Sequence, residues 1–211
     1  MKPYTVKKLW IPVVLAVILL LLVLLEPVQQ PRTYMNVNRE IPYAGEIPVQ
    51  HDYLSWDSRR RPGEVRDIMY ITIHETDNTS PTADASAHAA FLRNITDSPN
   101  GWHYTVDDHS IVHHIPDNEI AYNAGDGRTP NGGNMNGIGI EMCVNDGGDY
   151  EQTLRNTAVL CAELMAQYGL NVGDIRFHAD FMEKECPHRL ISEGRVDEFL
   201  QMVQEEADRR Q

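Results

Sequence analysis

The chain has few cysteines and, over most of its length, a shortage of positive charge. Its 211 residues include only Cys143, Cys161 and Cys186, and three cysteines cannot form the disulfide framework of a small secreted domain. The first 25 residues hold three of the 18 basic residues and no acidic one, so the remainder carries 15 basic against 31 acidic side chains. Because such a surface repels nucleic acid, we expect no nucleic-acid partner.

One uncharged run near the N-terminus lacks the marks of a cleaved signal peptide. Leu9 to Leu25 contains no charged residue and is followed by Glu-Pro, without an A-x-A pattern or a lipobox cysteine. At about 1.5 Å per residue the run spans about 25 Å, slightly less than the roughly 30 Å core of a bilayer. We favour an uncleaved transmembrane anchor, with a cleaved signal peptide as the alternative. Lys2, Lys7 and Lys8 predict a cytoplasmic N-terminus.

This anchor divides the chain into four predicted parts. Residues 1–8 form a cytoplasmic N-terminus, 9–25 the anchor, 26–63 an extracytoplasmic tether and extended arm, and 64–211 the folded domain. The tether is rich in Pro, Gln, Asn and Arg without periodicity, which is typical of a linker. We therefore expect a single-pass protein of the cell membrane with a monomeric folded domain outside it.

The folded domain shows interleaved strand and helix patterns. Short runs rich in β-branched residues predict strands, and apolar residues recurring every three or four positions predict helices. Strands are predicted at 67–73, 137–144 and 175–178, a hairpin at 103–115, and helices at 79–94, 149–168 and 192–210. The first of these helices is expected to begin near Ser80-Pro81 or near Asp84. Because strands and helices do not alternate strictly, we expect an α/β fold with a single mixed β-sheet flanked by helices.

His178 and Cys186 are the first candidates for a metal site. His178 ends a short strand pattern, I-R-F-H, and Cys186 follows eight residues later in a polar loop. Two protein ligands cannot complete a zinc site, so a third must come from elsewhere. His74 is favoured because it also closes a strand, I-T-I-H, and neighbouring strands that end together bring their side chains to one edge of the sheet. A His2Cys set leaves a fourth position open, as catalytic zinc sites do.

Four other histidines are weaker candidates for the third ligand. His88 lies in a predicted helix and His103 in the predicted hairpin. His113 and His114 are adjacent on a strand, so they point to opposite faces and cannot both bind one ion. Taken alone, each of the four is more often an ordinary surface or core histidine.

Glu141 and Lys184 are candidates for proton transfer and charge stabilisation. Glu141 lies inside an apolar strand pattern, and spacing alone favours a solvent-facing position over a catalytic one. If it faces the cleft instead, its carboxylate is placed to act as a general base. Lys184, two residues before Cys186, is either a solvated loop lysine or a cation that stabilises a developing oxyanion.

Four ordered segments of the chain resemble a known family. They are IHETDNTSPTADASAHAAFLRN, GWHYTVDDHSIVHHIPDNEIAYNAGDG, GNMNGIGIEMCVNDGGDY and FHADFMEKECPHRL. They resemble successive blocks of the zinc-dependent N-acetylmuramoyl-L-alanine amidases, the family that includes phage T7 lysozyme and the peptidoglycan recognition proteins. The resemblance runs from about Tyr70 to Leu190 and is strongest to autolysins and prophage endolysins of Gram-positive bacteria.

The resemblance implies a role for each candidate residue. It makes His74, His178 and Cys186 ligands of Zn2+, Glu141 the catalytic carboxylate and Lys184 the residue that assists the oxyanion. The implied reaction is hydrolysis of the amide that joins N-acetylmuramic acid to L-alanine of the peptidoglycan stem peptide. Zinc would polarise the carbonyl and activate water, and Glu141 would carry a proton to the leaving amine. Residues 64–211 are then a zinc amidase catalytic domain.

The chain departs from the family pattern at two positions, and two alternative functions remain open. Relatives commonly carry a histidine where this chain has Asn123, and Ser or Thr where it has Gly137. Neither position is a zinc ligand in the family, but the first leaves the substrate contacts nearby open. The alternatives are a non-catalytic peptidoglycan-binding or sensing module of the same fold and a zinc peptidase. Cys186 favours an enzyme, since non-catalytic members of this fold typically lack it.

Overall fold

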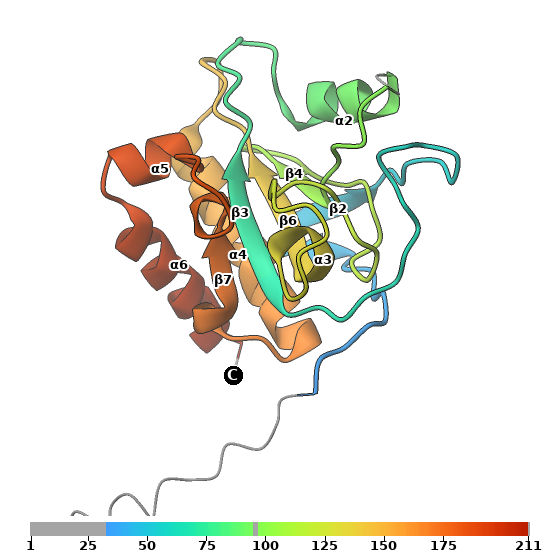
Figure 1. Ribbon diagram of the computed structural model, residues 1–211. Helices are drawn as coiled ribbons and strands as arrows, with labels where there is room; N and C mark the ends of the chain where they lie inside the picture. Colours follow the sequence, from blue (N-terminus) through green and yellow to red (C-terminus); the bar gives the residue numbers. More distant parts are fainter. Residues whose placement is uncertain (1–32, 95–96, 211) are drawn as a thin grey trace, which may run out of the picture. The chain divides into compact units, whose positions relative to one another are not determined.

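A mixed β-sheet of seven strands forms the centre of the domain (Figure 1). The computed structural model describes residues 33–94 and 97–210, so the predicted anchor at 9–25 lies outside the described residues. None of the helices within the described ranges has the length and apolarity that a bilayer span requires. Residues from 34 onward belong to one unit. The expectation of an α/β fold with one mixed sheet is confirmed.

The sheet has the strand order β1-β2-β5-β4-β6-β3-β7. Its strands are β1 (Tyr43–Ala44), β2 (Ile47–His51), β3 (Tyr70–Glu75), β4 (Tyr104–Val106), β5 (Ile111–His113), β6 (Gly137–Met142) and β7 (Ile175–Phe177). The central pairs β4–β6, β6–β3 and β3–β7 are parallel, as is β2–β5, whereas β1–β2 and β4–β5 are antiparallel. The carboxyl ends of β4, β6, β3 and β7 therefore lie at one edge of the sheet.

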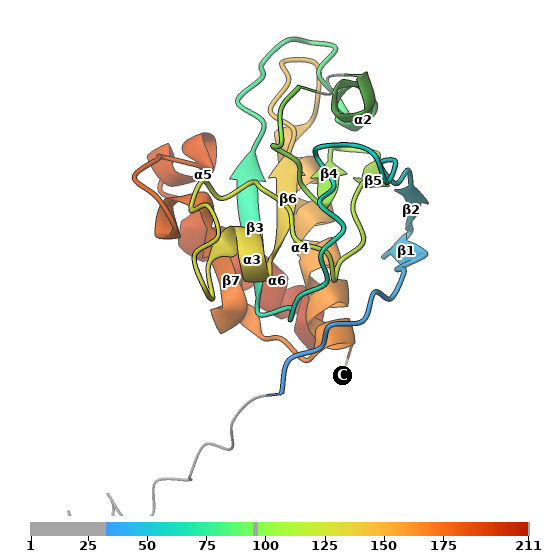
Figure 2. The ribbon, with the colours of Figure 1, turned by 45° about the vertical axis from the view of Figure 1, so that its right-hand side comes forward.

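Helices cover both faces of the sheet. They are α2 (Ala85–Asn94), α3 (Gly133–Asn136), α4 (Tyr150–Tyr168), α5 (His188–Ser192) and α6 (Val196–Asp208), with short 3-10 turns η1 (Val172–Asp174) and η2 (His178–Asp180). α4 and α6 lie together behind the sheet, while α2 and α3 lie on the other side (Figures 1 and 2).

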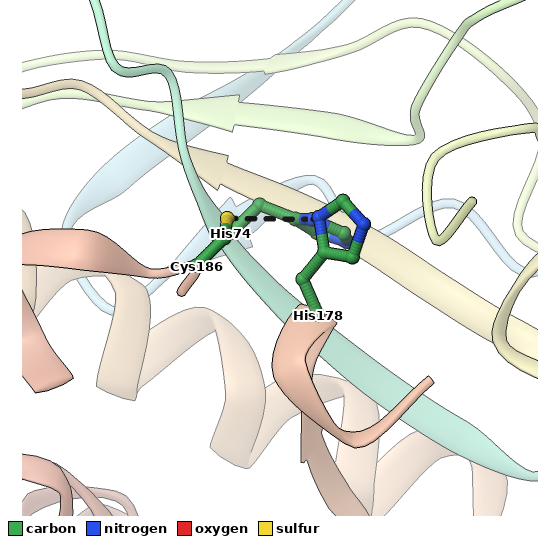
Figure 3. A group of neighbouring side chains, drawn as sticks. All are labelled: His74, His178 and Cys186. Carbon is green, nitrogen blue, oxygen red and sulfur yellow. Dashed lines mark hydrogen bonds between the residues drawn. The ribbon is translucent and has the colours of Figure 1, made fainter. Parts of the chain in front are cut away.

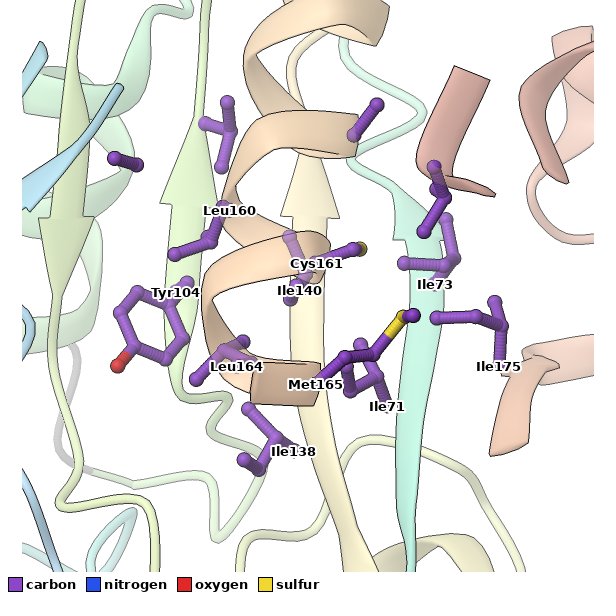
Figure 4. Close-up of a cluster of buried hydrophobic side chains, with 14 of the residues drawn as sticks. Ile71, Ile73, Tyr104, Ile138, Ile140, Leu160, Cys161, Leu164, Met165 and Ile175 are labelled. Carbon is purple, nitrogen blue, oxygen red and sulfur yellow. The ribbon is translucent and has the colours of Figure 1, made fainter. Parts of the chain in front are cut away.

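The main hydrophobic core lies between the sheet and α4 (Figure 4). Successive side chains of a strand point to opposite faces, so Ile71 and Ile73 of β3 and Ile138 and Ile140 of β6 all reach the α4 side. Each of these isoleucines is fully buried. The alternate positions of the same strands, which include His74, therefore face the opposite side.

The predicted helices are found with corrected boundaries. α4 matches its prediction: the Asp149 carboxylate accepts a hydrogen bond from the backbone N–H of the first turn, and Gly169 ends the helix in the left-handed region at φ 67°. The helix predicted within 79–94 is α2, and of its two predicted starting points Asp84 is the one found: the Asp84 side chain accepts a bond from the N–H of Ala87 at 2.7 Å. The helix predicted at 192–210 is found as α6, which begins only at Val196 because Gly194 at φ 67° separates it from α5.

Two strands come from the stretch that the sequence assigns to the arm. β2 pairs in parallel with β5, which places Val49 beside Ile111. Beyond β2, Leu54 is buried while Trp56 is exposed. Arg61 stacks on the Trp56 ring and forms a buried bidentate ion pair with Glu119 at 2.7 and 2.8 Å. This ion pair holds the segment before β3 against the body of the domain.

Candidate metal centre

His74 lies near the carboxyl end of β3, between β6 and β7. The β3–β6 register sets His74 beside Glu141, and the β3–β7 register sets Ile73 beside Phe177, directly before His178. Side chains paired across a sheet share a face, so His74 and Glu141 both leave the sheet on the side opposite α4. The expectation that His74 follows its strand was wrong in detail, because it is the penultimate residue of β3.

His74, His178 and Cys186 meet at this edge of the sheet (Figure 3). The Nδ1 atoms of His74 and His178 are 3.0 Å apart, and the Cys186 Sγ lies 4.0 Å from His74 Nδ1. All three residues are buried, with exposed fractions of 1%, 7% and 1%. The backbone N–H of Ala179 donates to the carbonyl of Cys186 at 3.1 Å, which holds the two halves of the last segment together.

The donor set fits a zinc ion. Tetrahedral zinc with Zn–N of about 2.0–2.1 Å and Zn–S of about 2.3 Å needs ligand atoms separated by about 3.3 Å (N to N) and about 3.6 Å (N to S). The observed separations of 3.0 and 4.0 Å are close to these values. Two imidazoles and a thiol that converge in a buried position have the donor types of a catalytic zinc site, and the assignment of these residues as ligands stays a prediction.

The protonation states of the three residues also suit a cation. Burial and the neighbouring His178 lower the pKa of His74 to about 3, and burial together with Lys184 lowers the pKa of His178. Both imidazoles are therefore neutral near pH 7, with nitrogen lone pairs available. Burial raises the pKa of the Cys186 thiol to about 12, so this thiol needs a bound cation to lose its proton near neutrality.

Glu75 fixes the segment that carries Cys186. Its carboxylate accepts hydrogen bonds from the backbone N–H groups of Arg189, at 2.6 Å, and Leu190, at 3.3 Å, in the first turn of α5. The hydroxyl of Tyr150 in α4 also donates to it. The sequence analysis missed this residue, although an acidic side chain next to His74 in a buried strand is a signal that could have found it.

Glu141 and Lys184 line the same cleft, which has a volume of about 690 Å³. The Glu141 Oε2 is buried and has no hydrogen-bond partner among the described residues. Burial raises the pKa of Glu141 to about 8, although the charge of Lys184 opposes this shift. The Lys184 Nζ lies 3.6 Å from the Asp77 carboxylate, and both side chains are about half exposed. Glu141 thus faces a cleft rather than open solvent.

A second cleft of about 410 Å³ adjoins the first. Both are lined by Trp102 and Glu141, and the second continues along α2 past His88 and Phe91. The Glu141 carboxylate therefore lies where the two clefts meet, and a long substrate can extend to either side of it.

The other candidate histidines lie outside the metal-binding group, and they are His88, His103, His113 and His114. His103 is buried in a structural role: its Nδ1 accepts from the N–H of Gly139 at 2.9 Å, and its Nε2 lies 3.0 Å from the carbonyl of Glu119. His113 lies 3.2 Å from the buried Asp117 carboxylate. Burial among polar partners thus accounts for both.

A mixed sheet with a buried His2Cys group at its strand ends, beside a carboxylate and a lysine, has the architecture of a zinc-dependent hydrolase. The chain belongs to the N-acetylmuramoyl-L-alanine amidase family, whose model matches residues 64–189. The family resemblance inferred from the sequence is thereby confirmed.

Curated relatives and solved structures agree with this family. The amidase XlyA of Bacillus subtilis (strain 168) is 39% identical over 145 residues, which cover 69% of this chain and 48% of XlyA. CwlH of the same organism is 38% identical over 145 residues, which cover 69% of this chain and 57% of CwlH. The chain thus spans about half the length of the curated relatives it matches.

The structural match covers nearly all of the related catalytic domain. The catalytic domain of XlyA has a TM-score of 0.70 and 37% identity, covering 74% of this chain and 99% of that domain. PlyL has a TM-score of 0.69 and 27% identity, covering 76% of this chain and 99% of PlyL.

Replacing Glu141 with Gln should stabilise the metal-free protein, and more at pH 8 than at pH 5. The folded chain keeps the Glu141 proton up to a pKa of about 8, whereas the unfolded chain loses it near 4.5. The bound proton therefore contributes its full share of the free energy of unfolding below pH 4.5, and this contribution is lost as the pH rises from 4.5 through 8. Gln avoids this loss, and we expect a gain of about 1–3 kcal/mol at pH 8, discounted for partial exposure.

Urea denaturation of the metal-free protein at both pH values measures this gain. Glu193, the exposed ion-pair partner of Arg189, supplies the control, because Glu193→Gln removes a carboxylate that lines neither cleft. A Glu141→Gln variant with the same stability as the wild type at pH 8 would show that the carboxylate is not buried as described.

Proposed function

We propose that the chain is a membrane-anchored zinc amidase that hydrolyses the amide between N-acetylmuramic acid and the L-alanine of the peptidoglycan stem peptide. The observation that carries the proposal is the buried convergence of His74, His178 and Cys186 beside the cleft that Glu141 and Lys184 line. Membership of the amidase family and the names of the relatives support this choice of bond.

Glu141 is placed to move protons during the reaction. It pairs with His74 across the β3–β6 register and lies where the two clefts meet. As a carboxylate it takes a proton from the attacking water and then delivers it to the amide nitrogen. Cleavage of the C–N bond leaves a free carboxylate on the lactyl group and a free amine on L-alanine. Without metal, burial holds the pKa of Glu141 at about 8 despite the charge of Lys184. A zinc ion held beside it would lower this pKa and favour the carboxylate for the first step, since opposite charge lowers a carboxyl pKa.

Lys184 is placed to stabilise negative charge on the carbonyl oxygen. A zinc ion held by His74, His178 and Cys186 would polarise the amide carbonyl and lower the pKa of water. Lys184 faces the same cleft and adds a second positive charge, which counts most in the transition state, where the oxygen becomes negative. The ion pair with Asp77 at 3.6 Å keeps the ammonium group near the cleft.

The purified full chain should release free L-alanine amino termini from bacterial cell walls, and a chelator should abolish the release. Glu141→Gln should lower the rate by about 10²–10⁴-fold because the proton carrier is lost. Lys184→Met should lower it by about 10²–10³-fold because the oxyanion loses a counter-charge. Amine labelling of the soluble products, followed by mass spectrometry, measures both effects.

Glu193→Gln, at the exposed residue that directly follows α5, is the matched control and should keep full activity. Shortened peptides in place of intact stems would identify a peptidase instead. Zinc binding without release of any product from several wall types would leave a wall-binding module and contradict the catalytic proposal.

The membrane part of the proposal is supported by the sequence alone. The uncharged run from Leu9 to Leu25 follows three lysines, which favours a cytoplasmic N-terminus and a catalytic domain on the outer side. A chain anchored in this way acts on peptidoglycan within reach of the outer face of the cytoplasmic membrane.

Fractionation of cells that express the full chain tests the anchor. We expect the full chain in the membrane fraction, resistant to high salt and carbonate, because about 17 apolar residues cannot be extracted without detergent. Replacing two leucines of the run, Leu20→Arg and Leu21→Arg, should release it from the membrane. Recovery of a soluble wild-type chain shortened at its N-terminus would instead establish a cleaved signal peptide.

A further inference from the structure

The second ring nitrogen of His74 has a partner of its own. While Nδ1 faces His178 and Cys186, the Nε2 atom lies 3.0 Å from the side-chain oxygen of Asn123. Nε2 must therefore carry the ring proton, because an amide oxygen can only accept. This tautomer leaves the Nδ1 lone pair free on the side where the three candidate ligands converge.

The orientation of the Asn123 carboxamide is fixed by a second hydrogen bond. Its Nδ2 donates to the carbonyl of Ala121 at 3.1 Å, so the oxygen is directed at His74. A rotation by 180° would set the amide oxygen against the Ala121 carbonyl oxygen, and the bond to Ala121 would be lost whichever ring nitrogen of His74 carries the proton. The described orientation is therefore the one that keeps both hydrogen bonds.

The surroundings of Asn123 hold it in place. The side-chain oxygen of Asn134 accepts bonds from the backbone N–H groups of Asn123 and Ala124, each at 2.7 Å. Asn134 is itself buried and donates to the carbonyl of Gly127 at 3.0 Å. On β6, a Cβ at Gly139 would come within 2.7 Å of the Asn123 carboxamide carbon, so only glycine leaves room for it.

We propose that Asn123 is a positioning residue that fixes the ring tautomer and orientation of His74 for metal binding. A partner on the second nitrogen of a ligand histidine orients the ring and raises its basicity, and losing that partner typically weakens metal affinity by about 10–100-fold. The inference rests on the proposed function in one respect, because His74 must be a zinc ligand. It gives a role to Asn123, the position at which relatives commonly carry a histidine.

Zinc affinity of the full chain, measured in detergent by competition with a chromophoric chelator, tests this role without any substrate. Asn123→Leu keeps the size of the side chain but removes the acceptor, and it should weaken zinc binding by about 10–100-fold. Asn123→Asp loses the bond to Ala121 but keeps an acceptor oxygen for the His74 ring, and it should bind zinc about tenfold or more tighter than Asn123→Leu. Asn118→Leu, away from the site, is the control and should not differ from the wild type.

The ring proton itself provides a second readout. In the zinc-loaded wild type, the Nε2–H of His74 should give a slowly exchanging proton NMR signal because it is hydrogen-bonded and buried. This signal should persist in Asn123→Asp and exchange rapidly in Asn123→Leu, a difference that general destabilisation of the fold would not produce in this one group.

The outcomes separate this inference from the proposed function. Wild-type affinity in Asn123→Leu, together with an unchanged ring-proton signal, would overturn the positioning role while leaving the amidase proposal intact. Reduced wall hydrolysis at saturating zinc with unchanged affinity would make Asn123 a substrate contact instead. Absence of zinc binding by the wild type would overturn both proposals.

Discussion

Parallel pairing of β3 with β6 on one side and β7 on the other is the constraint on which the site depends. It brings residues separated by about a hundred positions to one edge of the sheet, with His74 between Glu141 and His178. A shift of β3 by one residue would turn His74 towards α4 and expose Ile73 on the cleft side, so burial of the isoleucines under α4 also fixes the register of the site.

The rest of the site is added by loops that are tied to these strands. Glu75, next to His74 but on the opposite face, accepts backbone hydrogen bonds at the start of α5 and so places the loop that carries Cys186. On the other side, the segment through Asn123 reaches the back of the His74 ring. The end of β3 thus positions both the loop that carries Cys186 and the loop that carries Asn123. For this reason three candidate ligand atoms are buried together although loops form much of the cleft.

The strands and the long helix could be predicted from the sequence because their signals are local. The I-T-I-H and I-R-F-H patterns marked two strand ends, and their pairing in the sheet is the feature that brings His74 and His178 together. The role of Asn123 could not be predicted, because it depends on a contact across 49 positions and on the space left by Gly139.

Glu141 shows why periodicity alone was insufficient. Alternation correctly places its side chain away from the α4 core, but alternation cannot distinguish open solvent from a cleft. The cleft arises from α2, the loop before it and the segment that carries Lys184, which lie far away in the sequence. The short strands β1 and β2 were missed for a related reason, since their pairing with β5 rather than their composition defines them.

X-ray absorption at the zinc edge of the zinc-loaded protein tests the central claim most directly. Convergence of His74, His178 and Cys186 predicts one sulfur neighbour at about 2.3 Å and nitrogen or oxygen neighbours at about 2.0–2.1 Å. The sulfur should disappear in Cys186→Ser and persist when Cys161, a buried core residue of α4, is replaced with Ala. A spectrum without sulfur in the wild type, or one in which the sulfur survives in Cys186→Ser, would contradict the account.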